Sequence, residues 1–291
     1  MQARAQDILA EFSAAEDLPA DYPALAERWF VPLADYLLSC HQARAAPLLV
    51  GLHGAQGTGK TTLCRVLELL LADCDVRVLT LSLDDFYLGR KARQQLALQV
   101  HPLLATRGVP GTHEIALLQK TIRALRAGES CRVPRFDKSQ DDRLPEGQWV
   151  ETGPADIVLL EGWCVGAVAE SESALAQPVN ELEAKEDAEG DWRRYVNERL
   201  GAEYAELFSG LDYLVMLQAP CLEAVLQWRT LQEHKLARNE QGQGLMDDAA
   251  VERFVQHYQR ITRHSLATLP ELADYLLLLG EDHRVRSARH R

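Results

Sequence analysis

The sequence contains no apolar run long enough to cross a membrane, and its first twenty residues lack the apolar core of a signal peptide. We therefore expect a soluble protein without membrane contact. No internal repeat is visible, and no C-x-x-C pair occurs among the six scattered cysteines, which are Cys40, Cys64, Cys74, Cys131, Cys164 and Cys221. Such a scatter is typical of buried or free thiols in a reducing compartment, so we expect a cytoplasmic location.

Positive charge is also scarce, with 31 Lys and Arg against 43 Asp and Glu and a formal net charge of −12. This balance disfavours a general nucleic-acid surface, which needs a basic face. An acidic protein that binds a small anion must gather its basic side chains locally. The 291 residues, 47% of them apolar, suffice for one α/β domain with insertions and a sizeable core.

Apolar runs alternate with helical patterns along the chain. Residues 1–46 read as a helical extension, and residues 47–291 as the main domain. Five short runs predict strands at 47–52, 76–83, 157–160, 211–217 and 275–279. Strands that alternate with helices predict a parallel sheet covered on both faces.

Three further local patterns lead to expectations about single segments. Thr112 is suited to cap a helix whose apolar face recurs from Ile115 to Leu125 and which Gly128 ends. Residues 170–192 are acidic and poor in apolar side chains, so we expect a solvated, partly helical insertion. The basic tail at 281–291 is expected to be solvated as well.

The stretch GAQGTGKT at 54–61 fits the pattern G-x-x-x-x-G-K-[ST] between an apolar run and a helical one. Glycines there allow backbone N–H groups to wrap a phosphate, and the helix N-terminus adds further donors. Lys60 can then reach the β- and γ-phosphates, and the Thr61 hydroxyl can bind Mg²⁺. A glycine-rich turn without a ligand is the alternative. We call residues 54–61 the phosphate loop.

Acidic residues follow two of the predicted strands. Asp84 and Asp85 lie in LSLDDFYL, and Glu161 follows the apolar run 157–160 in ADIVLLEGW. Parallel strands bring their carboxyl ends to one edge of the sheet, so these acids should lie near the phosphate loop. One aspartate could accept a proton from an attacking hydroxyl, and Glu161 could hold Mg²⁺. An Asx turn and a solvated glutamate are the alternatives.

Basic residues gather between those strands, in HPLLATRGVPGTHE at 101–114 and CRVPRFDKSQDDRL at 131–144. Arginine forks bind carboxylates, so this stretch favours a small anionic acceptor. Arg107 and Arg135 are the preferred candidates because each adjoins Gly or Pro in a loop. For Arg132 and Arg143, surface charge or helix capping is the simpler interpretation.

A helical pattern near residue 229 carries three more cations, Arg229, Lys235 and Arg238, ahead of a glycine-containing loop. They could form a lid that closes over the phosphates and excludes water. A solvated helix face is the alternative.

Taken together, GAQGTGKTT, LSLDDFYL, HPLLATRGVPGTHE, VPRFDKSQDDRL, IVLLEGW and VLQWRTLQEHKL resemble the D-glycerate 3-kinase family. These are P-loop kinases related to phosphoribulokinase, uridine kinase and pantothenate kinase. The resemblance covers roughly residues 45–280. It implies a three-layer P-loop NTPase fold with a mostly parallel five-stranded sheet and lid insertions, and transfer of the ATP γ-phosphate to a small hydroxy acid. One departure is Glu114, where relatives are expected to carry Asp.

The resemblance also implies roles for individual residues. ATP and Mg²⁺ would bind at Gly54, Ala55, Gln56, Gly57, Thr58, Gly59, Lys60, Thr61 and Thr62, with Glu161 near the metal. The catalytic set would be Asp84, Lys60 and Arg229. The acceptor would meet Asp85, Tyr87, Arg107, His113, Arg135 and Lys138. Another acceptor, such as pantothenate, a nucleoside or a sugar, and an ATP-binding regulator without phosphotransfer remain as alternatives.

Overall fold

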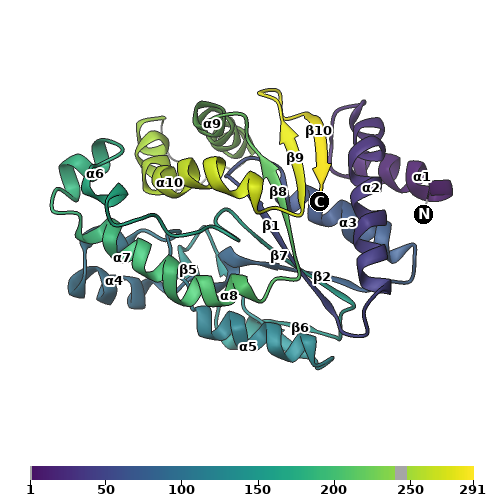
Figure 1. Ribbon diagram of the computed structural model, residues 1–291, viewed down its shortest axis with the longest axis horizontal. Coiled ribbons are helices and arrows are strands. Elements are labelled where there is room, and N and C mark those ends of the chain that lie inside the picture. The colour runs from purple at the N-terminus through teal and green to yellow at the C-terminus, as the bar shows by residue number, and fades with distance from the viewer. Residues whose placement is uncertain (1, 240–247) are drawn as a thin grey trace.

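The protein is described here from a computed structural model, which covers residues 2–239 and 248–291, with side chains within 4–231 and 250–291 (Figure 1). Its centre is a six-stranded sheet in the order β10-β9-β8-β1-β7-β2. The strands are β1 (Leu48–Gly54), β2 (Val78–Ser82), β7 (Ile157–Gly162), β8 (Tyr213–Gln218), β9 (Tyr275–Leu279) and β10 (Val285–His290). The first five are parallel, as predicted, and β10 adds an antiparallel edge.

Helices cover both faces of this sheet (Figure 1). They are α1 (Gln2–Ala15), α2 (Tyr22–Gln42), α3 (Lys60–Ala72), α4 (Arg90–Gln99), α5 (Ile115–Arg126), α6 (Glu181–Glu186), α7 (Asp191–Arg199), α8 (Ala205–Ser209), α9 (Leu222–Asn239) and α10 (Asp248–Thr268). Two short ribbons lie outside the sheet, β3 (Cys131–Val133) with β6 (Val150–Thr152), and β4 (Phe136–Asp137) with β5 (Asp142–Arg143). No helix in the described ranges is long and apolar enough to span a bilayer.

The core has two layers, one on each face of the sheet, because successive side chains of a strand point to opposite faces. In β1, Leu48, Val50 and Leu52 join the cluster under α1, α2 and α3, whereas Leu49 joins the one under α5 and α7. Successive side chains of a strand point to opposite faces, so an almost continuous apolar run is what a doubly covered strand requires. This explains why β1 and β7, which are buried along their whole length, were visible as apolar runs in the sequence.

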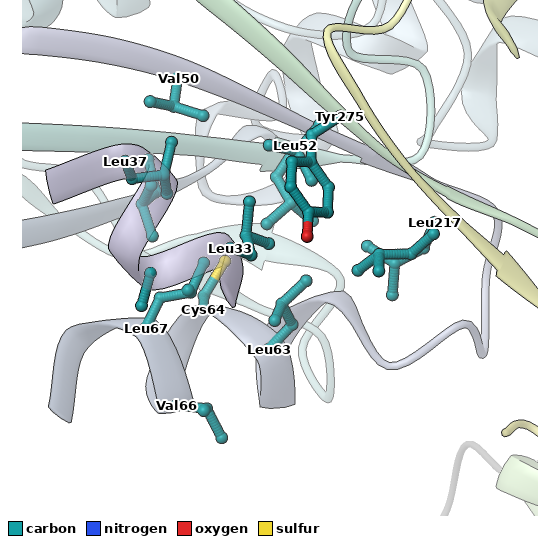
Figure 2. Close-up of a cluster of buried hydrophobic side chains, with 14 of the residues drawn as sticks. Leu33, Leu37, Val50, Leu52, Leu63, Cys64, Val66, Leu67, Leu217 and Tyr275 are labelled. Atoms are coloured by element: carbon teal, nitrogen blue, oxygen red, sulfur yellow. The ribbon is translucent and has the colours of Figure 1, made fainter. Parts of the chain in front are cut away.

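The N-terminal helices belong to the first of these layers. Leu33 and Leu37 of α2 are fully buried beside Leu63 and Leu67 of α3, as Figure 2 shows. Burying a leucine side chain contributes on the order of 1.5–3 kcal/mol. Most of the described N-terminal segment is helical, in α1 and α2, and both helices share a core with the sheet.

Helix α5 begins at Ile115 with Glu114 at the N-cap, so the prediction that Thr112 caps it was wrong. Thr112 is fully buried two residues earlier. Its hydroxyl accepts from the N–H of Gly108 at 3.0 Å and donates to the carbonyl of Val109 at 2.7 Å. Thr112 therefore stabilises the turn before the helix.

The acidic segment 170–192 is partly helical and largely exposed, as expected, but the expectation that it lacks buried side chains was wrong. Leu175, Leu182 and Trp192 are buried, and Glu183 is fully buried. The Glu183 carboxylate accepts from Arg260 of α10 at 2.6 Å. A partner 77 residues away neutralises this acid, so local composition could not reveal its burial.

The basic tail is solvated, as expected, but it also forms a strand that was not predicted. Residues 285–290 form β10, which pairs with β9 through five residue pairs and is exposed along most of its length. Charged side chains on an exposed edge strand oppose pairing with other chains. Its backbone is ordered by the sheet although its side chains remain in water.

Candidate active site

The phosphate loop connects the buried end of β1 to the first turn of α3, as the motif predicts. Gly54 is the last residue of β1, and Gly59 is the N-cap of α3. The Lys60 ammonium donates to the carbonyl of Ala55 at 3.1 Å, and the Thr58 hydroxyl donates to the same carbonyl at 2.9 Å. These two bonds curl residues 54–61 around the helix N-terminus, where free N–H groups favour an anion.

Glycine is required at the three loop positions for different physical reasons. A Cβ on Gly54 would lie 2.6 Å from the Thr58 hydroxyl, and one on Gly57 would lie 2.8 Å from the Cβ of Trp228 in α9. Gly59 has φ +87° with no atom within 4 Å of a built Cβ. Two glycines thus permit close packing within the protein, and Gly59 supplies the left-handed turn that opens α3 toward solvent.

The acids predicted at the strand ends do come together. Glu161, in β7, accepts from the Ser82 hydroxyl at the end of β2 at 2.8 Å. Burial raises the pKa of Glu161 although the Lys60 charge opposes it. Burial also lowers the pKa of Lys60, against the negative charges of Glu161 and Asp84. This mutual influence places the phosphate-loop lysine and both acids in one electrostatic neighbourhood.

Asp84 lies in the 3-10 turn (Leu83–Phe86) that follows β2. Its carboxylate accepts from Lys138 at 2.8 Å and from the Tyr87 hydroxyl at 2.7 Å. Burial alone would raise the pKa of Asp84, but Lys138 and Tyr87 outweigh it and lower the pKa to about 2. The Asp84 carboxylate is therefore ionised throughout the neutral range.

An open cleft of about 380 Å³ joins these groups. Its lining residues are Thr61, Cys64, Arg65, Glu68, Thr80, Ser82, Asp84, Asp85, Arg135, Lys138 and Glu161. Six of the predicted site residues, from four separate segments, thus face one space. A nucleotide-binding loop, an ionised carboxylate and two cations around one cleft can bind a phosphate donor and an anionic acceptor.

Two predicted acceptor cations are already paired with predicted acids. Arg135 donates to Asp85 at 2.5 Å, in addition to the pair between Lys138 and Asp84. Asp85 also accepts from the backbone N–H of Phe136 at 3.1 Å, which ties the β4 ribbon to the end of β2. In the cleft, Arg135 and Lys138 are therefore paired cations rather than bare ones.

Arg107 is not among the cleft-lining residues. Its guanidinium pairs with Asp141, which Arg93 also contacts at 2.9 Å. Arg93 is 1% exposed, so it fixes Asp141 from within the protein. The Arg107 guanidinium lies over the ring of Phe136 at 5.4 Å, which brings it beside the ribbon that carries Arg135.

Tyr87 and His113 lie behind Asp84, and both are buried. Their rings stack with centroids 4.6 Å apart. The turn that carries His113 includes Gly108 and Gly111, where an added Cβ would lie 2.1 Å from the Tyr258 hydroxyl and 2.6 Å from the Tyr195 ring, respectively. The glycines of RGVPGTH therefore allow α7 and α10 to approach this turn closely.

The predicted lid is only partly described. The backbone N of Arg229 lies 3.7 Å from a Cβ built on Gly57, and its guanidinium lies 5.4 Å over the ring of Phe254. Helix α9 therefore brings Arg229 next to the phosphate loop. The side chains of Lys235 and Arg238, and the glycine-containing loop after them, lie outside the described residues.

Several polar residues at the site were not predicted. Ser82 could have been found, because it is polar at the end of β2 and so faces Glu161. Asp141, which holds Arg107, stands in a quoted motif but carries no signal of its own. Tyr204, which contacts His113 at 2.6 Å, lies 91 residues away from it and has no local sequence signal.

The chain is similar in sequence to several known kinases. No protein-family model matches the chain. The chain is 35% identical over 223 residues to an uncharacterized kinase of Schizosaccharomyces pombe, covering 73% of this chain and 78% of that one. It is 31% identical over 234 residues to the chloroplastic D-glycerate 3-kinase of Arabidopsis thaliana, covering 77% of this chain but only 48% of the plant protein. The chain belongs to the D-glycerate 3-kinase family.

A solved structure agrees with that assignment. The D-glycerate 3-kinase of Cryptococcus neoformans superposes with a TM-score of 0.72 at 25% identity, over 90% of this chain and 99% of that one. The protein is thus an ATP-dependent small-molecule kinase with a P-loop NTPase fold, as the motifs predicted. These relatives favour a kinase over the alternative of a regulator without phosphotransfer.

Proposed function

We propose that the protein transfers the γ-phosphate of ATP to D-glycerate and forms 3-phosphoglycerate. The observation that carries the proposal is one cleft lined by the phosphate-loop residue Thr61, the ionised Asp84 and the cations Arg135 and Lys138. A small hydroxy acid needs a cation for its carboxylate and an acceptor for its hydroxyl proton. The names of two relatives supply the choice of glycerate.

In the proposed reaction, residues 54–62 hold the phosphates of ATP, and Lys60 and Arg229 offset their charge. An acceptor hydroxyl oxygen bonds to the γ-phosphorus while the bond from that phosphorus to the bridging oxygen of ADP breaks. The hydroxyl proton passes to Asp84. With a pKa of about 2, Asp84 is a weak base toward a free alcohol. It first orients the hydroxyl and takes the proton late, as the new bond acidifies it.

The cleft offers oxygen donors that fit Mg²⁺, namely the Thr61 hydroxyl and the Glu161 carboxylate. Within the described residues no group of three or more His, Cys, Asp or Glu side chains could hold a metal alone. Two protein oxygens fit Mg²⁺, which binds through one or two protein ligands and completes its shell with phosphates and water. When bound, the ion would neutralise charge on the phosphates.

The acceptor carboxylate would bind arginines that are already paired with aspartates of the protein. Arg135 is bound to Asp85 and Arg107 to Asp141, so each arginine is oriented before the acceptor arrives. An arginine guanidinium that is already held by one carboxylate loses less rotamer freedom when it binds the carboxylate of the acceptor. Tyr87 would support Asp84 through its hydroxyl bond.

The test measures the Michaelis constants of variants with D-glycerate and with ATP. Arg135→Ala and Arg107→Ala should raise KM for D-glycerate roughly tenfold or more, because a charge-assisted hydrogen bond contributes about 1.5–3 kcal/mol. KM for ATP should change little. Arg132→Ala, which removes an exposed arginine of β3, is the matched control. If all three variants kept the wild-type KM for D-glycerate, the assignment of the carboxylate site would be wrong.

The cytoplasmic location and the lack of nucleic-acid or membrane partners stay predictions. Pantothenate, a nucleoside or a sugar would be a different acceptor in the same chemistry. The acceptor panel described in the Discussion separates these cases.

A further inference from the structure

The imidazole of His113 is held from one side by a tyrosine of a distant segment. Its Nδ1 lies 2.6 Å from the hydroxyl of Tyr204, and that hydroxyl accepts from the N–H of Gly111 at 3.1 Å. His113 is 4% exposed and Tyr204 is fully buried. Among the side chains that the structure describes, Nε2 of His113 is a buried polar atom with no hydrogen-bond partner.

Counting hydrogen-bond partners selects one tautomer. If Tyr204 donates its proton to Nδ1, then Nε2 carries the imidazole proton, and Nε2–H is the single group left unpaired. If instead Nδ1–H donates to Tyr204, both the Tyr204 proton and the bare Nε2 are left unpaired in the interior. Each buried unpaired group costs on the order of 1–3 kcal/mol, so the first arrangement is favoured.

The ring is neutral, so its tautomer matters. Burial lowers the pKa of His113 to about 3, although the negative charge of Asp84 opposes this. At neutral pH one ring nitrogen therefore donates and the other accepts.

Backbone contacts place this ring behind Asp84, which lines the cleft. The N–H of Leu88 donates to the carbonyl of Thr112, and the N–H of Glu114 donates to the carbonyl of Phe86, each at 2.8 Å. His113 lies between these bonds and stacks on Tyr87, whose hydroxyl donates to the cleft residue Asp84. One side chain separates the imidazole from Asp84.

We propose that Tyr204 fixes His113 as the Nε2–H tautomer, and that this N–H donates a hydrogen bond to an oxygen of the acceptor next to Asp84. The inference rests on the proposed phosphotransfer to a small oxygen-bearing acceptor. Tyr204 is then a positioning residue, and His113 is a specificity-determining one. An acceptor without an oxygen at that place leaves the buried donor unpaired and is rejected.

The local fold explains how Tyr204 reaches this place. It is the last residue of a π-helical turn (Leu200–Tyr204) between α7 and α8. Single π turns inside helices are frequent at functional sites because they rotate a side chain out of the regular helical series. Gly111 has φ +93°, and an added Cβ would lie 2.6 Å from the ring of Tyr195 in α7. Glycine at 111 thus lets this N–H approach the Tyr204 hydroxyl.

The test is long-range ¹H–¹⁵N NMR of the histidine rings in the full chain, which distinguishes the two tautomers. Two other histidines serve as internal references, because Nδ1 of His53 faces the carbonyl of Val165 at 2.9 Å and Nδ1 of His257 faces that of Arg253 at 3.1 Å. A carbonyl only accepts, so both references should be Nδ1–H tautomers. His113 alone of the three should be Nε2–H.

Variants test the role of each partner. Tyr204→Phe should introduce the Nδ1–H tautomer of His113 and raise KM for the acceptor several-fold, with KM for ATP unchanged. His113→Gln, which keeps an amide N–H donor, should retain more acceptor affinity than His113→Leu. Tyr22→Phe removes a buried hydroxyl in α2, within the shared core of the N-terminal helices, and should alter neither quantity.

Three results would overturn the inference: an Nδ1–H tautomer of His113 in the wild type, an unchanged tautomer in Tyr204→Phe, or equal acceptor KM values for the Gln and Leu variants. The tautomer is measured without acceptor, so it stands apart from the proposed substrate. If D-glycerate were no substrate, the substrate assignment would fail while the tautomer result still decided the Tyr204 contact.

Discussion

The buried ion pair between Glu183 of α6 and Arg260 of α10 gives a prediction about stability. Glu183 is fully buried and accepts three hydrogen bonds, from Arg260 Nε at 2.8 Å, from Arg260 Nη2 at 2.6 Å and from the N–H of Val179 at 3.0 Å. Glu183→Gln keeps the side-chain volume but removes the charge and sets an NH₂ group toward the guanidinium. The variant therefore leaves a buried cation poorly compensated.

The magnitude follows from these contacts. Breaking a buried pair by removing one partner costs about 3–5 kcal/mol of unfolding free energy. Glu170 lies 3.1 Å from Nη1 of Arg260 and keeps part of the compensation, so we expect the lower end of that range, about 3 kcal/mol. For a chain of this length, such a loss lowers the melting temperature by roughly 6–12 °C.

Thermal unfolding followed by circular dichroism measures the effect. The matched control is Glu181→Gln in the same helix, since Glu181 is exposed and pairs with Lys185 at 2.7 Å in an i,i+4 arrangement. Such exposed pairs contribute about 0.5 kcal/mol or less, so its melting temperature should fall by no more than about 2 °C. Equal shifts for both variants would refute the burial of the 170–192 segment.

Three further predictions concern the cleft and the phosphate loop. Asp84→Asn should lower kcat by about 10²-fold or more while ATP still binds; near-normal turnover would contradict its role as base. Lys138→Met should raise the pKa of Asp84 from about 2, because burial then acts with less opposition, and so move the acid limb of kcat/KM to higher pH; an acid limb identical to the wild type in a pH series would disprove the coupling. The pKa of Asp84 is lower in the folded protein than its ordinary value of 3.8. Ionised Asp84 therefore stabilises the fold above pH 3.8, and this stabilisation is lost as the pH falls toward 2. Gly57→Ala should weaken ATP binding because the new Cβ would lie 2.8 Å from Trp228 at a φ of +81°, whereas Gly153→Ala meets no atom within 4 Å; equal ATP affinity in an equilibrium titration would count against this packing argument.

The parallel core was predictable from the sequence because its strands are mostly apolar, and β1 and β7 are buried on both faces. The runs at 157–160 and 275–279 are continuous apolar stretches, and each became a central or inner strand. The edge strand at 285–290 escaped because its side chains face water and its sequence is basic. Pairing with β9 comes from the backbone, which leaves little trace in composition.

The site residues also fall into those that could be predicted from the sequence and those that could not. Lys60, Asp84 and Glu161 could be placed because each ends or follows a strand of a parallel sheet, where topology fixes the location. The partners of the basic residues could not be placed, since Arg107 pairs with Asp141 through a loop contact and not through a periodic pattern. Tyr204 had no signal at all, because its role depends on a π-helical turn.

Segment 170–192 shows why composition misled. Its acids suggest solvation, yet Asp187 is bonded to the buried Arg193 at 3.0 Å, and Glu183 to Arg260. Charged residues are rarely buried unless they are paired, and a single sequence does not show distant pairs.

The central claim is that the cleft phosphorylates D-glycerate. The direct measurement is ADP release from Mg·ATP with D-glycerate, compared with L-glycerate, pantothenate, uridine and ribulose 5-phosphate, with the product identified by NMR. We expect strong stimulation by D-glycerate alone and 3-phosphoglycerate as the product. Stimulation by another compound, with D-glycerate inert, would contradict the proposed acceptor and the carboxylate role of Arg107 and Arg135.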